Sequence, residues 1–219
     1  GADDQQPPPA CEHAQGHLDA LIAGDVYRER LTVTNYGQVA ARQPGMFECE
    51  AEGLRALAAA GALRVPEVLA VSDEALVLEF IEPGSKSGDF FVDFGRHFAL
   101  LHQTRGKVCG FAHDNFIGST PQQNAPVDGE WVEPGTTVEP GDGLDWPQFF
   151  IQRRLRFQVE LAVRNGHGDE LAELLDRSEE AITELLSEDI ERPSLLHGDL
   201  WSGNYLVDAS GRPCLIDPA

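Results

Sequence analysis

The sequence predicts an α+β fold of two lobes, a small first lobe with an antiparallel sheet and one main helix, and a mostly helical second lobe. Three observations predict it. Short β-rich segments surround one strongly helical segment early in the chain, several helical segments follow, and the chain closes on a short hairpin. The predicted division is a flexible leader over residues 1–16, a first lobe with its hinge over 17–82, and a second lobe over 83–219.

The composition favours a folded protein and excludes two classes of partner. The 219 residues are 42% hydrophobic and carry 37 acidic against 16 basic side chains, for a net charge of −21. This field repels nucleic acids and anionic membranes, and no apolar run reaches the roughly 20 residues of a membrane helix. We therefore expect a cytoplasmic protein with neither partner. The basic run Arg153, Arg154 and Arg156 is expected to form a solvated helix face or local ion pairs.

The elements of the first lobe follow from local patterns. Residues 25–41 contain β-rich pieces around a turn at 35–37, which predicts strands. Residues 46–61 combine strong helix formers with one apolar face and a final glycine, which predicts the main helix. Two apolar runs, 68–71 and 76–81, are separated by a Ser-Asp-Glu turn and are predicted as strands.

The second lobe is predicted to begin with a helix over residues 89–104. Its buried stripe is expected to consist of Phe90, Phe94, Phe98 and Leu101. Residues 110–143 are rich in Gly, Pro, Asn and Asp and are expected to hold two functional loops. Helical periodicity returns over 146–165 and 168–188. The apolar side of the last helix is expected to consist of Leu171, Leu174, Leu175, Ile182, Leu185 and Leu186.

The end of the chain brings three polar side chains together. Residues 205–208 and 213–217 flank a turn and are predicted to form a β-hairpin. Asn204 precedes the first strand and Asp217 ends the second, so antiparallel pairing places both at the same end, where Asp199 can face them. Oxygen ligands at one point suit Mg²⁺ with nucleotide phosphates. A third carboxylate can accept a proton from a hydroxyl, which completes a site for phosphoryl transfer.

The stretch HGDLWSGN, residues 197–204, parallels the catalytic loop of protein kinases. Its pattern H-G-D-x-x-x-x-N, followed by a hairpin and D-P-A, corresponds to H-R-D-x-x-x-x-N and D-F-G. Asp, Gly, Ser and Asn also crowd ordinary turns. Residue identity, spacing and predicted local structure agree, so we favour the kinase-like site, and with it a protein-kinase-like fold.

The chain resembles the fructosamine kinase (ketosamine-3-kinase) family from about Met46 to its last residue. The resemblance is carried by HGDLWSGN, by IDPA at the end, and by MFECEAEGL, HDNFIGSTPQQN and DWPQFFIQRRL. It implies ATP- and Mg-dependent phosphorylation of a sugar hydroxyl on a ketosamine, either a small molecule or a glycation adduct on a protein. Aminoglycoside and choline kinases share H-G-D-x-x-x-x-N, but the Leu-Trp-Ser-Gly filling and the IDPA ending favour the fructosamine branch.

The resemblance implies roles for the residues at the end of the chain. Asp199 would be the catalytic base, and Asn204 and Asp217 would be the metal ligands. His197 would brace the catalytic loop rather than transfer protons. Trp201 would wall the substrate pocket, with a place in the core as the alternative.

The resemblance also implies a nucleotide site built from the first lobe. Glu50, on the main helix, matches the acid that pairs with a strand lysine, and a solvated helix acid is the alternative. The strand LVLEFIE would supply the hinge, with backbone groups of Glu79, Phe80 and Ile81 facing adenine.

One departure from the family pattern concerns the strand lysine, which holds the α- and β-phosphates in kinases. The family places it near Tyr36, but the first lysine of this chain is Lys86. The arginines that could replace it have a planar donor fork of different shape. They are Arg28, Arg30 and Arg42.

Two further departures leave the activity open. The Gly-rich phosphate loop is reduced to Ala23, Gly24 and Asp25. Family members continue past D-P-A into further helices. The sequence is therefore interpreted as an excerpt, a truncated form, the product of an altered gene model, or a degenerate relative.

The functional alternatives are an aminoglycoside or choline type of kinase, a pseudokinase that binds nucleotide without transfer, and a scaffold protein. The oligomeric state is not predicted.

Overall fold

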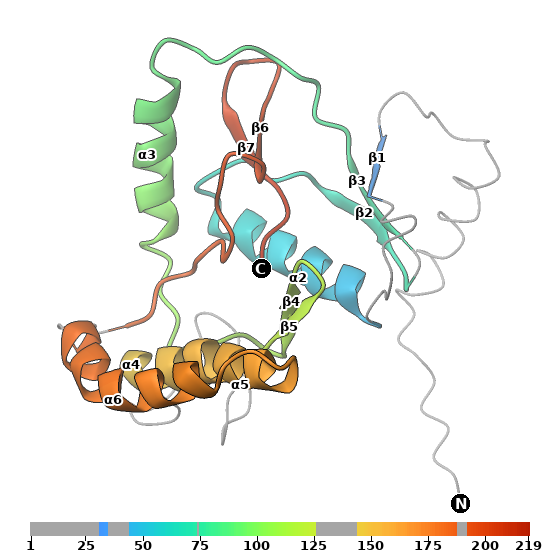
Figure 1. The fold of residues 1–219 in the computed structure, drawn as a ribbon. Coiled ribbons are helices and arrows are strands. Elements are labelled where there is room, and N and C mark those ends of the chain that lie inside the picture. The colour runs from blue at the N-terminus through green and yellow to red at the C-terminus, as the bar shows by residue number, and fades with distance from the viewer. Residues whose placement is uncertain (1–30, 35–43, 74, 126–143, 188–191) are drawn as a thin grey trace, which may run out of the picture. The chain divides into compact units, whose positions relative to one another are not determined.

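The computed structural model describes the backbone of residues 31–34 and all atoms of most residues in 44–73, 75–125, 144–187 and 192–219. The chain divides into two compact units, shown in Figure 1. The first unit combines residues 1–101 with 197–219, and the second unit spans 102–196. The predicted leader lies outside the described residues, and the predicted lobe boundary at residue 82 stays a prediction.

The first unit contains a three-stranded antiparallel sheet of order β1-β3-β2. These strands are β1 (Leu31–Thr34), β2 (Val68–Val71) and β3 (Leu76–Glu79). The predictions of strands near 68–71 and 76–81 are confirmed, although β3 ends two residues early. A strand within 25–41 is also confirmed, while the turn predicted at 35–37 lies outside the described residues.

Helix α2 (Met46–Ala60) packs against this sheet, as its sequence pattern predicts. The buried positions Phe47, Ala51 and Leu54 recur at helical spacing and meet Leu76 and Leu78 of β3 in one apolar cluster. Burial of each large aliphatic side chain contributes about 1.5–3 kcal/mol. The helix ends at Gly61, whose left-handed φ of 65° closes the last turn.

Helix α3 (Phe90–Leu101) packs beside the hairpin of β6 (Tyr205–Val207) and β7 (Pro213–Leu215) (Figure 1). The ring of Tyr205 lies 5.8 Å from that of Phe90 and 5.1 Å from that of Phe94. The predicted stripe is confirmed for Phe90, Phe94 and Leu101, whereas Phe98 is half-buried. The predicted hairpin is also confirmed, with Leu206 opposite Cys214.

The hairpin turn is organised by the carboxylate of Asp208, which is 1% exposed. Its Oδ1 accepts hydrogen bonds from the amide and hydroxyl of Ser210 at 2.9 and 2.6 Å, and from the amide of Arg212 at 3.0 Å. Burial acts to raise the pKa of this carboxyl. The hydrogen bonds from Ser210, Arg212 and Arg64 outweigh burial and hold the pKa well below its usual range.

Arg64 links this hairpin to the end of β3. Its guanidinium donates to Asp208 Oδ2 at 2.9 Å and to Glu79 Oε1 at 2.7 Å. Its backbone carbonyl accepts from the amide of Leu215 in β7 at 2.8 Å. The hairpin is therefore attached to the rest of the first unit by both side-chain and backbone hydrogen bonds of Arg64.

The second unit combines a small hairpin with helices. Its elements are β4 (Asn115–Ile117), β5 (Thr120–Gln122), α4 (Trp146–Phe149), the π-helix η2 (Phe150–Arg156), α5 (Phe157–Arg164) and α6 (Asp169–Leu186). The two predicted helices are confirmed, but a π-helical segment interrupts the first. The prediction of a loop is wrong for the β4–β5 segment, and residues 126–143 lie outside the described part. None of the described helices is long and apolar enough to cross a membrane.

The predicted apolar side of α6 is only partly buried. Leu175 is 7% exposed, whereas Leu171, Leu174 and Leu185 are 46%, 51% and 75% exposed.

Replacing Asp208 by Asn should lower the free energy of unfolding by about 1–3 kcal/mol, because one amide oxygen cannot accept all the hydrogen bonds of the carboxylate. The folded-state pKa of Asp208 lies below its unfolded value of about 4. Its stabilisation is therefore present above about pH 4 and lost as the pH falls toward the folded-state pKa. Thermal denaturation of both proteins should give a constant difference at neutral pH that shrinks below pH ~4.

The matched control is Asp93→Asn, which removes an exposed carboxylate paired with Arg96 on α3. Exposed pairs contribute little, so its melting temperature should stay close to that of the wild type. Equal stability of the Asp208→Asn variant and the wild type at pH 7 would contradict the role given to this carboxylate.

Candidate functional site

Asp199, Asn204 and Asp217 come together at one end of the β6–β7 hairpin. Asn204 is 4% exposed. Its Nδ2 donates to the backbone carbonyl of Asp199 at 2.8 Å and to Asp199 Oδ2 at 3.1 Å, and it lies 3.3 Å from the carbonyl oxygen of Asp217. The carbonyl of Asn204 accepts from the amide of Ile216 at 3.1 Å. The amide side chain thus lies between the two aspartate residues.

The segment 197–204 crosses the Asp-Pro-Ala segment at Gly198. The amide of Ala219 donates to the carbonyl of His197 at 2.9 Å. Gly198 has a φ of +88°, and a Cβ at this position would lie 1.9 Å from the carbonyl oxygen of Ala219. A side chain is excluded by both the backbone conformation and the close approach.

His197 has the geometry of a structural brace. Its ring is 1% exposed, and Nε2 donates to the carbonyl of Ile216 at 2.9 Å. Burial, as the largest cause, lowers the pKa of this imidazole. The neutral ring therefore connects the loop that carries Asp199 to the end of β7.

Glu50 and Asp217 form an acidic pair in the first unit. Burial, and next the negative charge of Asp217, raise the pKa of Glu50 to about 7. No ion pair joins Glu50 to a lysine or arginine within the described ranges. The arginines predicted as possible partners lie outside those ranges: Arg28, Arg30 and Arg42. The two carboxylates repel each other, so a cation placed near them would be stabilised.

The donor chemistry of the site fits Mg²⁺. Asp217 supplies carboxylate oxygens and Asn204 an amide oxygen, and Mg²⁺ usually takes only one or two protein carboxylates, with phosphates and water completing its coordination. No described group of three or more His, Cys, Asp or Glu side chains is arranged to hold a metal ion.

The predicted hinge residues differ in how their groups are used. The amide of Glu79 donates to the carbonyl of Glu67 at 2.8 Å, and its carboxylate pairs with Arg64. That amide is therefore not available to a nucleotide base. Phe80 is 42% exposed and Ile81 is 5% exposed. Their backbone contact with adenine stays a prediction.

Trp201 is 60% exposed, so the alternative that it belongs to the core is wrong. A Cβ on Gly203 would lie within 2.8 Å of the indole ring, so the ring stacks closely over that glycine. A role in substrate binding stays a prediction.

The predicted functional loop HDNFIGSTPQQN uses its polar groups internally. Asp114 Oδ1 accepts from the amides of Asn124 and Ala125 at 2.8 and 2.9 Å. Arg154, in the π-helix, is half-buried and donates to the side chain of Asn124, which corrects its prediction as part of a solvated face. Arg156 instead forms the predicted local ion pairs, with Asp176 and Glu179.

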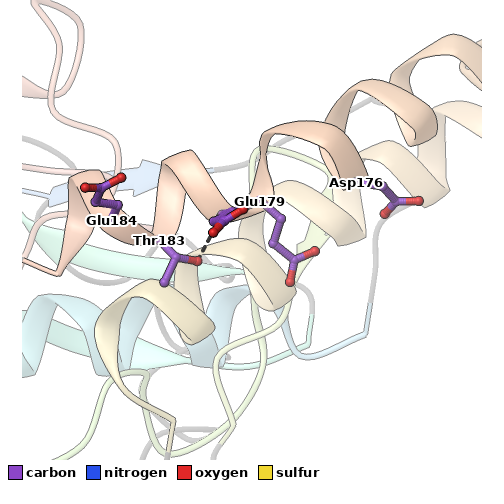
Figure 2. Close-up of a pocket in the computed structure, with 5 residues that line it drawn as sticks. Asp176, Glu179, Thr183 and Glu184 are labelled. Atoms are coloured by element: carbon purple, nitrogen blue, oxygen red, sulfur yellow. Dashed lines mark hydrogen bonds between the residues drawn. The ribbon is translucent and has the colours of Figure 1, made fainter.

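A pocket on the second unit carries no candidate chemistry. Figure 2 shows that its labelled lining residues all project from α6. Four of its five lining residues are acidic, and Arg156 already pairs with two of them. The lining residues are Asp176, Glu179, Glu180, Thr183 and Glu184.

Two residues of the first unit were not identified by sequence reasoning. Arg64 connects β3 to the hairpin, and Gly53 of α2 contacts Pro218 beside Asp217. The position of Gly53 inside a predicted helix was the available signal, because a glycine in a helix interior often marks close packing. Arg64 had no signal, since its partners are remote in sequence.

Comparison with known proteins gives a consistent result. The fructosamine kinase family model matches residues 37–219. A "probable ketoamine kinase" from Synechocystis is 36% identical over 185 residues, 82% of this chain and 56% of that protein. A chloroplastic protein-ribulosamine 3-kinase from Oryza sativa subsp. japonica is 36% identical over 183 residues, 80% of this chain and 48% of that protein. The chain thus spans about half the length of these relatives.

Solved structures support the fold. A crystal structure from Thermobifida fusca, of a protein assigned as a fructosamine-3-kinase, matches with a TM-score of 0.68 and 27% identity, over 86% of this chain and 60% of that chain. A second, from Haemophilus somnus, matches with a TM-score of 0.63 and 22% identity, over 86% of this chain and 57% of that chain. The predicted α+β class is confirmed.

Replacing Gly198 by Ala should lower the free energy of unfolding by more than about 2 kcal/mol, because the new Cβ meets both an unfavourable φ and a backbone oxygen. Chemical denaturation measures this loss. The control is Gly88→Ala, where an added Cβ meets nothing within 4 Å. Similar stability of the two variants would show that the chain crossing at Gly198 is absent in solution.

Proposed function

Because the chain belongs to the fructosamine kinase family, we propose that it has a two-lobed, protein-kinase-like fold and transfers the γ-phosphoryl group of ATP, with Mg²⁺, to a sugar hydroxyl of a ketosamine. The observation that carries the proposal is the convergence of Asp199, Asn204 and Asp217 at one end of a hairpin. A carboxylate beside a Mg²⁺-type donor set is what phosphoryl transfer to a hydroxyl requires.

Asp199 acts as the catalytic base. It accepts the proton of the acceptor hydroxyl as that oxygen bonds to the γ-phosphorus and the bond to the β-phosphate oxygen breaks. The hydrogen bond from Asn204 at 3.1 Å orients its carboxylate, and His197 braces the loop that carries it. Neutralisation of phosphate charge is the chemistry that Mg²⁺ supplies when bound.

Asn204 and Asp217 are the residues that would hold Mg²⁺. Asp217 adopts a left-handed backbone with a φ of 55°, a conformation that Asp and Asn tolerate better than most residues. The nearby Glu50 carboxylate makes a cation favourable at this position. Phe80 and Ile81 are the hinge positions that we assign to adenine.

The ketosamine is proposed as the acceptor, as a small molecule or attached to a protein. The names of the ketoamine and ribulosamine kinases among the relatives support this substrate class. The net charge of −21 is compatible with any cationic amine acceptor. Aminoglycosides and choline therefore remain the alternative acceptors, and parallel assays separate them from ketosamines.

A second candidate function is nucleotide binding without transfer. It is favoured by the sequence, which has no lysine before Lys86 and only Ala23, Gly24 and Asp25 in place of a Gly-rich phosphate loop, since a kinase of this type uses both to hold the phosphates. A purely scaffolding role ranks below both functions because it leaves the convergence of the three polar residues unexplained.

We expect ATP to raise the melting temperature of the 219-residue chain only when Mg²⁺ is present. Ligand at 100 times its dissociation constant adds about 2.7 kcal/mol to the stability. In Asp217→Asn the Mg²⁺-dependent rise in melting temperature should be lost, because asparagine keeps the left-handed backbone but lacks the negative charge. Asp93→Asn, the matched charge control on α3, should keep that rise. Wild-type protein that is folded but shows no shift would contradict the nucleotide site.

Asp199→Asn should lower kcat for a ketosamine by about 10²-fold or more, because the general base is lost. Binding of ATP and Mg²⁺ by this variant, measured by calorimetry, should stay near the wild-type value. Unchanged turnover would show that Asp199 is not the base. Wild-type binding without turnover of ketosamines, aminoglycosides or choline would support the non-catalytic function instead.

A further inference from the structure

Helix α2 meets the Asp-Pro-Ala segment at Gly53. This glycine lies three residues after Glu50, on the same side of the helix. A Cβ on Gly53 would lie 2.9 Å from Pro218 Cγ and 3.4 Å from Pro218 Cβ. The absence of a side chain at Gly53 is therefore what allows Pro218 to lie against the helix.

The helix itself gives no reason for a glycine at this position. Glycine is among the least favourable residues in a helix interior, and Gly53 does not have the left-handed φ found at Gly45 and Gly61 on either side of the helix. The close approach of Pro218 does explain it. The residue thus weakens the helix and permits a tertiary contact.

The Asp217–Ala219 segment is held on both sides of Pro218. On one side, the proline ring packs on Gly53 of α2. On the other, the amide of Ala219 donates to the carbonyl of His197 at 2.9 Å. The ring of Pro218 also restricts the backbone that follows Asp217. Both contacts are made by the two residues that directly follow Asp217.

We propose that Gly53 is a positioning residue that sets the location of Asp217 by admitting Pro218 against helix α2. The inference rests on the proposed function, in which Asp217 binds Mg²⁺ with ATP. It connects the helix that carries Glu50 to the metal site through a steric contact, without a polar bond.

A methyl group at Gly53 would displace the segment. Carbon atoms in van der Waals contact lie about 3.5–4.0 Å apart, so Pro218 would have to move by roughly 0.5–1 Å. Mg²⁺ requires nearly ideal octahedral geometry at about 2.0–2.1 Å from its ligands. A shift of this size at Asp217 should therefore weaken metal-dependent binding while leaving the helix intact.

The test compares Gly53→Ala with Gly95→Ala. Gly95 lies within α3, and an added Cβ there meets nothing within 4 Å. Both changes improve helix propensity. We expect Gly95→Ala to keep wild-type affinity for ATP with Mg²⁺ by calorimetry. Gly53→Ala should weaken that affinity by about 10- to 100-fold, with little change in affinity for metal-free ATP and no loss of melting temperature.

A double variant makes the test specific to the contact. Pro218→Ala removes Cγ and leaves Cβ as the nearest atom, at 3.4 Å. In Gly53→Ala/Pro218→Ala the affinity should return to that of Pro218→Ala alone, so the two changes are not additive. If the losses of affinity in the two single variants add up in the double variant, the proposed steric coupling of Gly53 and Pro218 is wrong.

Amide hydrogen exchange of the nucleotide-free protein separates this proposal from the proposed function. The Ala219 amide, bonded to His197, should exchange faster in Gly53→Ala than in the wild type and Gly95→Ala, whether or not nucleotide binds. Unchanged exchange and unchanged affinity in Gly53→Ala would overturn the positioning role. A wild type that fails to bind ATP with Mg²⁺ would instead contradict the proposed function.

If Gly53→Ala fails to fold, Pro218→Ala decides the question, because it adds no atoms to the core. The proposal expects faster exchange of the Ala219 amide and weaker Mg²⁺-dependent binding in that variant. Wild-type values for both would overturn it.

Discussion

The ion pair between Arg64 and the buried carboxylate of Asp208 is the interaction on which the candidate site depends. The β6–β7 hairpin consists of two three-residue strands, and an isolated hairpin is marginally stable at best. Asp208 organises its turn, and Arg64 attaches that turn to Glu79 at the end of β3. The opposite end of the same hairpin carries Asn204 and Asp217. The bond at the turn therefore anchors the hairpin whose other end carries these two residues.

The site combines unfavourable local features that packing maintains. Asp217 has a left-handed backbone. Burial, and next the negative charge of Asp217, raise the pKa of the half-buried Glu50 to about 7. Backbone strain and like charges of this kind persist only where the surroundings determine the conformation, and they are typical of functional sites. Here Gly53 and Gly198 allow the surrounding segments to approach closely. A cation placed between the two carboxylates would relieve their repulsion.

The second unit uses its polar residues in a different way. The motif around Asp114 and Asn124 is satisfied by hydrogen bonds within the hairpin and from the π-helix. Such a network makes a local structure rigid, because each buried polar group has a partner. A polar, turn-rich motif can thus mark a built hairpin as readily as an open binding loop. The sequence pattern alone does not separate the two.

The sequence by itself determined the features that depend on neighbouring residues. The helix after Met46, the strands around residue 70, the hairpin and the alignment of Asp199, Asn204 and Asp217 were predictable, because periodicity, turn chemistry and strand pairing act over short separations. Only the tertiary structure decided the rest. Arg64 and Asp208 are 144 positions apart, so no local pattern encodes their ion pair. The way in which remote segments pack also decides three other features: the contact of Gly53 with Pro218, the hydrogen bond of the Glu79 amide, and the exposure of Trp201.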